Sequence, residues 1–430
     1  MSAPSSDTPR DGEVIGLVGL AHGTSHFFHL MLPPLFPWLM ADFSLSYTDV
    51  GLLTTTFFVI SGIGQALAGF VVDRIGSHRV LVFGIAALAV SGLLLGLSTS
   101  YAMLMMTAAV AGLGNCIFHP ADFTLLNQRV SQPRLGHAFS VHGLSGNAGW
   151  AAAPVFMAGT ASVAGWHAAG FGAAGIGATV LAILWWRRRA LTRTASEVVA
   201  AAAPATSSST SSRHFGFLSS GAVWLSFAFF LVTTMAFGIL QTYAPAILSE
   251  VYGVSLIVAS GGLTAYLLGS GAGIVTGGFV AARGDRMVAA ALGFAALMAA
   301  ILASGSMPSL ALWPLMAAMG FGVGMAGPGR DLLVRRAATS RFGGGSFGRV
   351  YGFVYSGLDT GQALSPLLFG PLLDAGRFRL ALVAVAVLQA AGLMTALHVG
   401  SRVRAAAVED STTKPDTTDA YAQRSGSPSA

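Results

Sequence analysis

Three histidines, His22, His26 and His29, lie four and three residues apart in an apolar stretch near the N-terminus of this 430-residue chain. At this spacing they share one face of a helix. Histidine changes its charge near neutral pH, so such a stripe can bind an anionic group or relay protons. Hydrogen bonds that only bridge neighbouring helices are the competing interpretation.

A second polar face occurs in a later apolar run, where Asn115, His119 and Asp122 are four and three residues apart. Pro120 removes a backbone donor there and is expected to bend the helix beside His119. Ionisable groups in an apolar run are costly unless they face a cavity or a partner. These residues are therefore candidate groups for binding a substrate or carrying protons.

The next apolar run opens with His142, which is followed by Ser145 and Asn147. If consecutive runs are antiparallel helices, His142 lies at about the depth of Asp122. Such a pair would carry a proton, gate one side of the protein or serve a structural role. The sequence leaves coupling and structure equally open for it.

No metal is expected at the first histidine stripe. Histidines three and four apart can share a zinc ion, but no carboxylate or thiolate lies near these three in the sequence. Cys116 is the only cysteine, which excludes an intramolecular disulfide and a thiolate cluster. We therefore expect neither a metal nor a cofactor.

The second half of the chain has fewer candidate residues. Asp359 lies near the middle of an apolar run, where an acidic residue suits a protonation switch. A static ion pair with Arg330 is the alternative, although Arg330 is itself a candidate ligand for an anion. Gln241 and Tyr243 are candidate hydrogen-bonding groups for a substrate, or residues of the membrane interface.

The composition predicts a membrane protein. The chain is 54% hydrophobic and 9% charged, whereas soluble domains are about 25% charged. The bilayer is therefore its expected solvent. The net charge of +6 is read as a topology signal and not as a sign of nucleic-acid binding.

Apolar runs long enough to cross a hydrocarbon core of about 30 Å recur along the chain. They predict an all-α membrane protein with twelve transmembrane helices in two pseudo-symmetric six-helix halves. The first run, 14–40, is too long for a signal peptide. The expected segments are a cytoplasmic N-terminal tail (1–13), a six-helix bundle (14–186), a cytoplasmic linker (187–218), a second six-helix bundle (219–399) and a disordered cytoplasmic tail (400–430).

Arginine placement predicts the orientation. With the N-terminus in the cytoplasm, nearly all arginines next to the runs fall on the cytoplasmic side, whereas Arg377 and Arg379 fall outside. This asymmetry satisfies the positive-inside rule. Both termini are then cytoplasmic, which requires an even number of spans.

Short motifs repeat between the two halves. Gly112, Gly114 and Pro120 align with Gly320, Gly322 and Pro328, and Gly149 and Pro154 align with Gly361 and Pro366. Halves related in this way place a binding site at their interface near the middle of the membrane. Chance recurrence in a glycine-rich chain is the competing interpretation.

The loop GFVVDRIGSHR runs from Gly69 to Arg79 between two apolar runs, and a degraded copy, GFVAARG, begins at Gly278. The loop resembles the signature loop between helices two and three of the major facilitator superfamily; the competing interpretation is an ordinary basic loop. The resemblance implies a cytoplasmic gating loop that latches the two halves together. Its residues are Gly69, Asp73, Arg74, Gly76 and Arg79.

A narrower resemblance rests on Gly112-x-Gly114-x-x-x-Phe-His119-Pro and Ser-Gly-Asn147-x-Gly149. These motifs are similar to those of the fosmidomycin-resistance branch, whose members are exporters in the inner membrane thought to be driven by protons. The chain departs from the branch in two ways. Ala121 separates His119-Pro from the acidic Asp122, and the later run lacks a Gly-Pro-x-x-Gly-Gly ending.

In this superfamily the first, fourth, seventh and tenth spans line the cavity. That resemblance, with the residues above, gives the candidate sites. The substrate-binding set is His26, His29, Asn115, His119, Asn147, Gln241, Tyr243 and Arg330; the proton-coupling set is Asp359, Asp122 and His142.

The leading hypothesis is a secondary transporter that exports a small polar or amphiphilic compound, with the proton gradient as its energy source. A symporter that imports an organic anion is the alternative, and a membrane-embedded enzyme is remote. The chain has no GxxxxGK[ST] motif, which excludes an ATP-driven pump. The expected partners are the substrate and the lipid bilayer, with no nucleic acid, for a monomer in a bacterial-type inner membrane.

Overall fold

The computed structural model describes residues 11–192, 221–280, 284–342 and 347–413, and nearly all of these residues are helical. Eight helices in this part of the chain are long and apolar enough to cross a membrane. A helix satisfies its own backbone hydrogen bonds, which a chain with so little charge needs in lipid. The predicted all-α membrane fold is confirmed.

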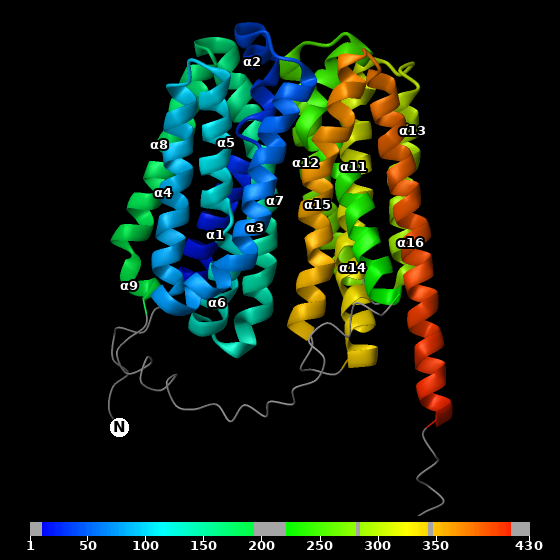
Figure 1. Cartoon of the computed structure of the whole chain (residues 1–430). Coiled ribbons are helices and arrows are strands. Elements are labelled where there is room, and N and C mark those ends of the chain that lie inside the picture. The colour runs from blue at the N-terminus through cyan, green and yellow to red at the C-terminus, as the bar shows by residue number, and fades with distance from the viewer. Residues whose placement is uncertain (1–10, 193–220, 281–283, 343–346, 414–430) are drawn as a thin grey trace, which may run out of the picture.

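The N-terminal half precedes the linker region and forms one bundle (Figure 1). Its elements are α1 (Asp11–His29), η1 (Pro33–Leu35), α2 (Phe36–Phe43), α3 (Tyr47–Ile75), α4 (Ser77–Gly96), α5 (Tyr101–Asn115), α6 (Phe118–Arg129), η2 (Gln132–Arg134), α7 (Leu135–Ala164), α8 (Trp166–Trp186) and α9 (Arg188–Leu191).

The C-terminal half forms the second bundle, which is in contact with the first at one end and separated from it at the other (Figure 1). Its elements are α11 (Gly221–Tyr252), α12 (Leu256–Val280), α13 (Asp285–Ala303), η5 (Ser309–Ala311), α14 (Leu312–Phe342), α15 (Phe347–Asp374) and α16 (Phe378–Thr413).

The two bundles have the same internal packing. In the first half α1 packs on α7, α4 on α8, and α3 on α5. In the second half α11 packs on α15, α13 on α16, and α12 on α14. Two symmetry-related pairs, α3 with α15 and α7 with α12, join the halves. The predicted pseudo-symmetry is therefore present in the contacts as well as in the sequence.

Aligned glycines occupy equivalent positions in the two halves. A Cβ at Gly112 would overlap a backbone carbonyl of α3, and a Cβ at Gly320 would overlap a carbonyl of α12. In the same way Gly149 meets the Gly23 carbonyl of α1, and its partner Gly361 meets a carbonyl of α11. The repeated glycines are the points where two backbones touch, because no side chain fits between them.

Two of the predicted runs are interrupted. The first was expected to span 14–40, but α1 ends at His29 and the chain continues through Pro33 and Pro34 into α2. The second is the apolar run that contains Asn115 and His119, residues 102–129, which divides into α5 and α6 at Cys116 and Ile117. Pro120 has no N–H to donate to the Cys116 carbonyl, so the helix breaks one turn before the proline.

The last helix is longer than expected. α16 continues to Thr413, whereas the apolar run ends at Val399 and residues 400–430 were expected to be disordered. Residues 405–407 are three alanines, and alanine favours helix without any apolar burial. Most of the predicted N-terminal tail and linker, residues 281–283 of the second loop copy, and residues 414–430 lie outside the described part.

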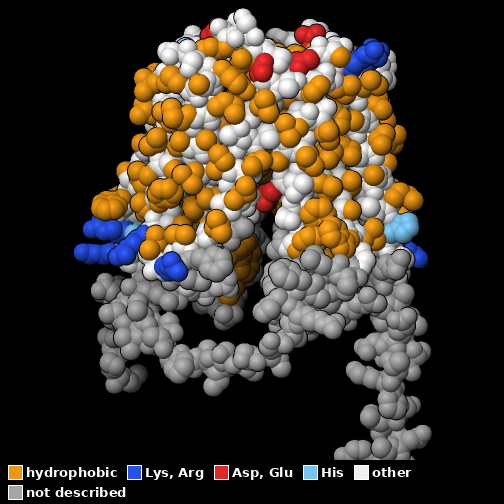
Figure 2. Space-filling view, viewed as in Figure 1, with side chains coloured by type: hydrophobic (Ala, Val, Ile, Leu, Met, Phe, Trp, Pro, Cys, Tyr) orange, Lys and Arg blue, Asp and Glu red, His pale blue; other side chains and the backbone are white. Residues whose placement is uncertain are grey.

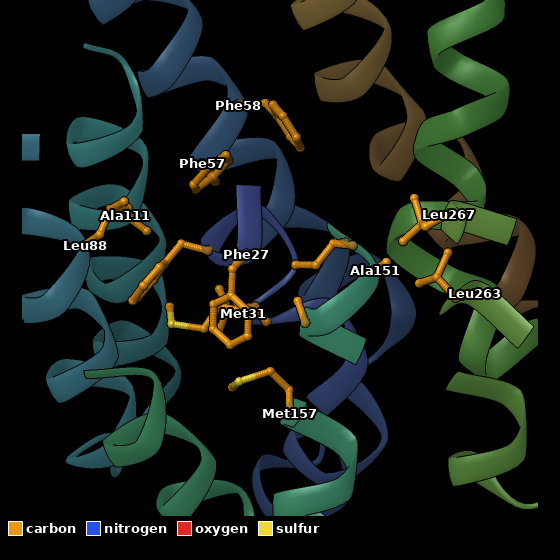
Figure 3. Packing of buried hydrophobic residues seen from close by; sticks show 14 of the residues in the cluster. Phe27, Met31, Phe57, Phe58, Leu88, Ala111, Ala151, Met157, Leu263 and Leu267 are labelled. Atoms are coloured by element: carbon orange, nitrogen blue, oxygen red, sulfur yellow. The ribbon is translucent and has the colours of Figure 1, made fainter. Parts of the chain in front are cut away.

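Buried apolar side chains form a core that crosses from one half to the other (Figure 3). Phe27, Phe57 and Met157 belong to the first half, and Leu263 and Leu267 of α12 belong to the second. Because lipid is as apolar as these side chains, close packing and not exclusion from water holds the helices together.

We predict that Gly149→Ala lowers the stability of the protein by about 1–3 kcal/mol, because the new methyl group would overlap the Gly23 carbonyl. Thermal unfolding in detergent can be followed by reaction of the buried Cys116 with a thiol-reactive dye. Gly159→Ala on the same helix is the control, since its Cβ would meet nothing within 4 Å. Equal melting temperatures for the two variants would contradict the prediction.

Candidate functional site

The site is built inside the N-terminal half, where the histidine stripe of α1 faces α5, α6 and α7. His22 and His26 are buried, and His29 is partly buried. α7 can approach α1 this closely because Gly146 and Gly149 lie at the contact; a Cβ at Gly146 would reach the His26 ring. The sequence spacing therefore identified the correct face of α1.

Asp122 of α6 lies at the centre of the first group of contacts. Its Oδ2 atom is 3.0 Å from Nε2 of His142 and 3.1 Å from Nδ1 of His22, and the carboxylate is fully buried. The His22 and His142 rings stack with centroids 3.5 Å apart. The predicted pairing of His142 with Asp122 is confirmed. His22 is a third member that the site prediction did not include.

Asn115 of α5 organises a second group of contacts. Its Oδ1 atom accepts hydrogen bonds from the Ser25 hydroxyl at 2.6 Å and from Nε2 of His29 at 2.7 Å. Its amide nitrogen donates to the Ser61 hydroxyl of α3 at 2.7 Å. Three helices, α1, α3 and α5, therefore share one amide side chain.

These contacts fix the protonation of His29. A carbonyl oxygen only accepts, so Nε2 of His29 carries the hydrogen toward Asn115. The indole of Trp150 only donates, and its Nε1 lies 3.3 Å from Nδ1 of His29, so Nδ1 is the acceptor. With one nitrogen donating and the other accepting, His29 is a neutral imidazole in this arrangement.

His26 connects the two groups. Its ring lies 4.3 Å from that of His22 and 4.2 Å from that of Trp150, measured between centroids. His119 is less buried than His22, His26 and His142, and its Nδ1 atom lies 2.9 Å from the side-chain oxygen of Gln65 of α3. An unbroken series of polar and aromatic side chains thus runs from Asp122 to Trp150, which itself touches Phe237 of the second half.

Asp359 and Asn147 occupy equivalent places where the two halves cross. A Cβ at Gly62 of α3 would lie 3.3 Å from the Asp359 Cβ, and one at Gly271 of α12 would lie 4.0 Å from the Asn147 Cβ. Asp359 is only partly buried. Figure 2 shows a hollow between the bundles toward their separated end, with an acidic side chain at its edge. The side chain of Arg330 lies outside the described part, so the predicted pair with Asp359 is not tested.

Gln241 and Tyr243 are buried in contacts within the protein. The side-chain amide nitrogen of Gln362 donates a hydrogen bond to the side-chain oxygen Oε1 of Gln241 at 2.5 Å. The Tyr243 hydroxyl lies 3.0 Å from the Tyr47 carbonyl oxygen of the first half and 3.2 Å from the Pro366 carbonyl oxygen. Their predicted role in binding a substrate stays a prediction, since in this conformation Tyr243 joins the two halves.

The halves are held together at what we call the closed end, where α3 begins and α15 ends. Asp374 accepts hydrogen bonds from the Tyr47 and Thr48 backbone amides and from the Thr48 hydroxyl. These amides belong to the first turn of α3, where a carboxylate is favoured. The other end, which we call the open end, contains the hollow of Figure 2.

The Gly69–Arg79 loop lies at the open end. Gly76, with a φ of 89°, makes the turn between α3 and α4. Arg74 and Arg79 are exposed, while the side chain of Asp73 lies outside the described part. Because the halves are apart at this end, the predicted latch is not formed by the described residues in this conformation.

Sequence reasoning missed several members of the site, namely Ser25, Ser61, Gln65 and Trp150 as well as the role of His22. The spacing of His22 with the other two histidines was the one available signal. Serine, glutamine and tryptophan are common in such helices, and nothing in their spacing shows which helix they face.

Comparison with known proteins places the fold and the site in context. The family model described as Major Facilitator Superfamily matches residues 18–344. The chain also resembles a crystal structure of a bacterial homolog of the human lysosomal transporter Spinster, in an inward-facing and unoccupied conformation. That likeness has a TM-score of 0.73 at 15% identity, over 93% of this chain and 99% of the other.

Two curated relatives match part of the chain. The fosmidomycin resistance protein of Escherichia coli K12 is 29% identical over 146 residues, which are 34% of this chain and 36% of the relative. The membrane sensor protein UhpC of the same organism is 32% identical over 151 residues, 34% of this chain and 33% of the relative. The matches thus cover about a third of each relative.

We predict that Asp374→Ala weakens the closed end, because three donors at the start of α3 lose their shared acceptor. Hydrogen bonds to a charged group contribute about 1.5–3 kcal/mol each. Spin labels on exposed Thr99 and Met307, one in each half, should show a longer or broader distance distribution in the variant.

Asp49→Ala is the matched control for this experiment. Asp49 caps the same end of α3 by accepting hydrogen bonds from Ser46. Within the described residues, none of its hydrogen bonds reaches the second half. An unchanged distance distribution in Asp374→Ala, or an equal change in Asp49→Ala, would show that Asp374 does not hold the halves together.

Proposed function

The chain belongs to the major facilitator superfamily, a family of membrane transporters and not of enzymes, and from this premise we propose that it exports a small polar or amphiphilic compound in exchange for protons. The observation that carries the proposal is the pairing of a closed end with an open end around a largely buried histidine cluster. We define this cluster as His22, His26, His29, His119 and His142 with Asp122.

The arrangement suits alternating access. At the closed end Asp374 and Tyr243 join α15 and α11 to the start of α3. The same helices, α3 and α15, separate toward the open end (Figure 1). Rocking of one bundle against the other would exchange the two ends around the middle of the molecule, as halves related by a repeat allow.

The histidine cluster supplies groups that can carry a proton. Histidine is the side chain that most readily gains and loses a proton at neutral pH, and the stacked rings give a proton several neighbouring nitrogens. Protonation of Nδ1 of His29 would end its acceptance of the Trp150 hydrogen bond. Since Trp150 touches Phe237 of α11, proton binding in one half is linked to a contact with the other.

The basic side chains support an inward-open state. Arg134 and Arg187 lie at the open end, where they contact Asp11 and Glu13 of α1. The hydrogen bond from Ser131 and the nearby Arg134 hold the pKa of Asp11 below its ordinary value. Arg377 and Arg379 follow α15 at the closed end. By the positive-inside rule the open end and the N-terminus face the cytoplasm of an inner membrane.

Similarity to the fosmidomycin resistance protein favours export. The chain also matches a protein named as a membrane sensor, so a sensing role is one outcome that the tests below can give. Import of an organic anion by symport, with the histidines and Arg330 as ligands, is the competing mode. The substrate class is best found by testing toxic compounds, fosmidomycin among them, for growth protection in a sensitised host.

We predict that a protective compound will release protons from energised inverted vesicles that contain the protein. Antiport moves protons out of the acidified lumen as the compound enters, so a lumenal pH dye should report a rise in pH. Vesicles without the protein are the control. No proton movement under any condition would contradict antiport, and proton entry together with the compound would support symport instead.

We predict that Asp359→Asn abolishes proton-driven accumulation but leaves substrate exchange measurable. Asparagine has nearly the shape of aspartate, so packing against Gly62 is preserved. Asn147 already provides the same amide at the equivalent crossing between the halves. Accumulation and exchange of the protective compound are measured in the same vesicles, with Asp49→Asn as the control. Accumulation that survives in Asp359→Asn would make Asp359 a structural residue.

A further inference from the structure

Three potential metal ligands from three helices converge inside the first bundle. They are His22 of α1, Asp122 of α6 and His142 of α7, and one ligand atom of each lies within 4.8 Å of the other two. We propose that these residues form a binding site for a divalent transition-metal ion, for which Zn²⁺ is the best chemical match. This inference goes beyond the proposed transport function and does not rest on it, but a bound ion would occupy three of the groups that are proposed there to carry protons.

The spacing of the three atoms fits a small tetrahedral ion. Asp122 Oδ2 is 3.1 Å from His22 Nδ1 and 3.0 Å from His142 Nε2. Two ligand atoms that each lie about 2.1 Å from a tetrahedral zinc ion are about 3.4 Å apart. The two distances to Asp122 are therefore near the separation that zinc coordination requires, and the stacked rings of His22 and His142 would have to rotate for both nitrogens to point at one ion.

Asp122 Oδ2 and His142 Nε2 form a hydrogen bond with each other, but two other atoms of the site are unsatisfied. Nδ1 of His22 and Oδ1 of Asp122 have no hydrogen-bond partner among the described residues, although both are buried. His22 Nδ1 is close to the carboxylate but is not aligned with it for a hydrogen bond. Buried polar atoms are nearly always paired, so these atoms indicate a missing partner. A cation at their common centre would contact both residues.

The type of ligand favours a transition metal over Mg²⁺ or Ca²⁺. Two imidazole nitrogens and one carboxylate oxygen are ligands of zinc and its neighbours, whereas magnesium and calcium prefer oxygen alone. The site has three protein ligands, which leaves a fourth position for water or another group, as in zinc sites that are not fully closed. His119 lies beside it, with its ring 5.6 Å from that of His22.

The expectation from sequence analysis is the opposite, namely that no metal binds at the α1 histidines, and the reason is simple. No carboxylate is near the α1 histidines along the chain, and the spacing of His22, His26 and His29 suggested ligands on one helix only. The fold brings Asp122 to His22 across a separation of 100 residues and adds His142 from a third helix. A metal there would join α1, α6 and α7 at one point.

The test uses the full-length protein in detergent, with any affinity tag removed and metals stripped by a chelator. Calorimetric titration with Zn²⁺ should show one ion bound per chain. Each of His22→Gln, Asp122→Asn and His142→Gln should weaken binding by at least about tenfold, the low end of the loss seen when residues around a metal are changed. His137→Gln, an exposed histidine on the same helix as His142, should bind as the unaltered protein does.

A further variant separates ligation from folding. His142→Cys replaces one zinc ligand with another, so it should restore binding that His142→Gln loses. With Co²⁺ as the probe, the restored site should show the added thiolate-to-metal absorption that the unaltered protein lacks. The proposal is wrong if the unaltered protein binds no Zn²⁺ at micromolar concentrations, if binding survives all three ligand substitutions, or if His142→Cys and His142→Gln lose it equally.

Discussion

The absence of water from the bilayer is the constraint on which this structure depends. Backbone groups satisfy each other within helices, so a polar side chain inside a bundle needs a partner either on its own helix, as Ser91 has, or on another helix. Asn115 shows the result, since its one amide contacts Ser25, His29 and Ser61 on two neighbouring helices. Such side chains can lie together only where glycines let the backbones approach, as Gly149 does for α1 and α7.

The fold was largely predictable because its signals are local and repeated. Apolar runs define the helices, and the aligned glycines define the two halves. The spacing of Asn115, His119 and Asp122 selected three side chains that all contact neighbouring helices inside the bundle, and the antiparallel order of two helices correctly paired His142 with Asp122. The breaks at Pro33 and before Pro120 were less predictable, since an apolar run continues through both.

The partners across helices could not be predicted in the same way. Helical spacing gives the face of a residue but not the helix that the face meets. Trp150 reads in the sequence as one more aromatic residue, yet its indole determines which nitrogen of His29 carries a hydrogen. Asp374 lies at a helix end, and only the fold places it against the first turn of α3, more than 300 residues away along the chain.

The two crossings between the bundles have one further consequence. Gly62 faces Asp359 at one crossing, and Gly271 faces Asn147 at the other. The two crossings are thus arranged alike, but of these two facing residues only Asp359 can become charged. An electric potential across a membrane exerts a force on charges and none on a neutral amide. When Asp359 is ionised, the membrane voltage acts on this residue at the α3–α15 crossing and not on Asn147 at the equivalent crossing, so two matching positions of the scaffold respond differently to voltage.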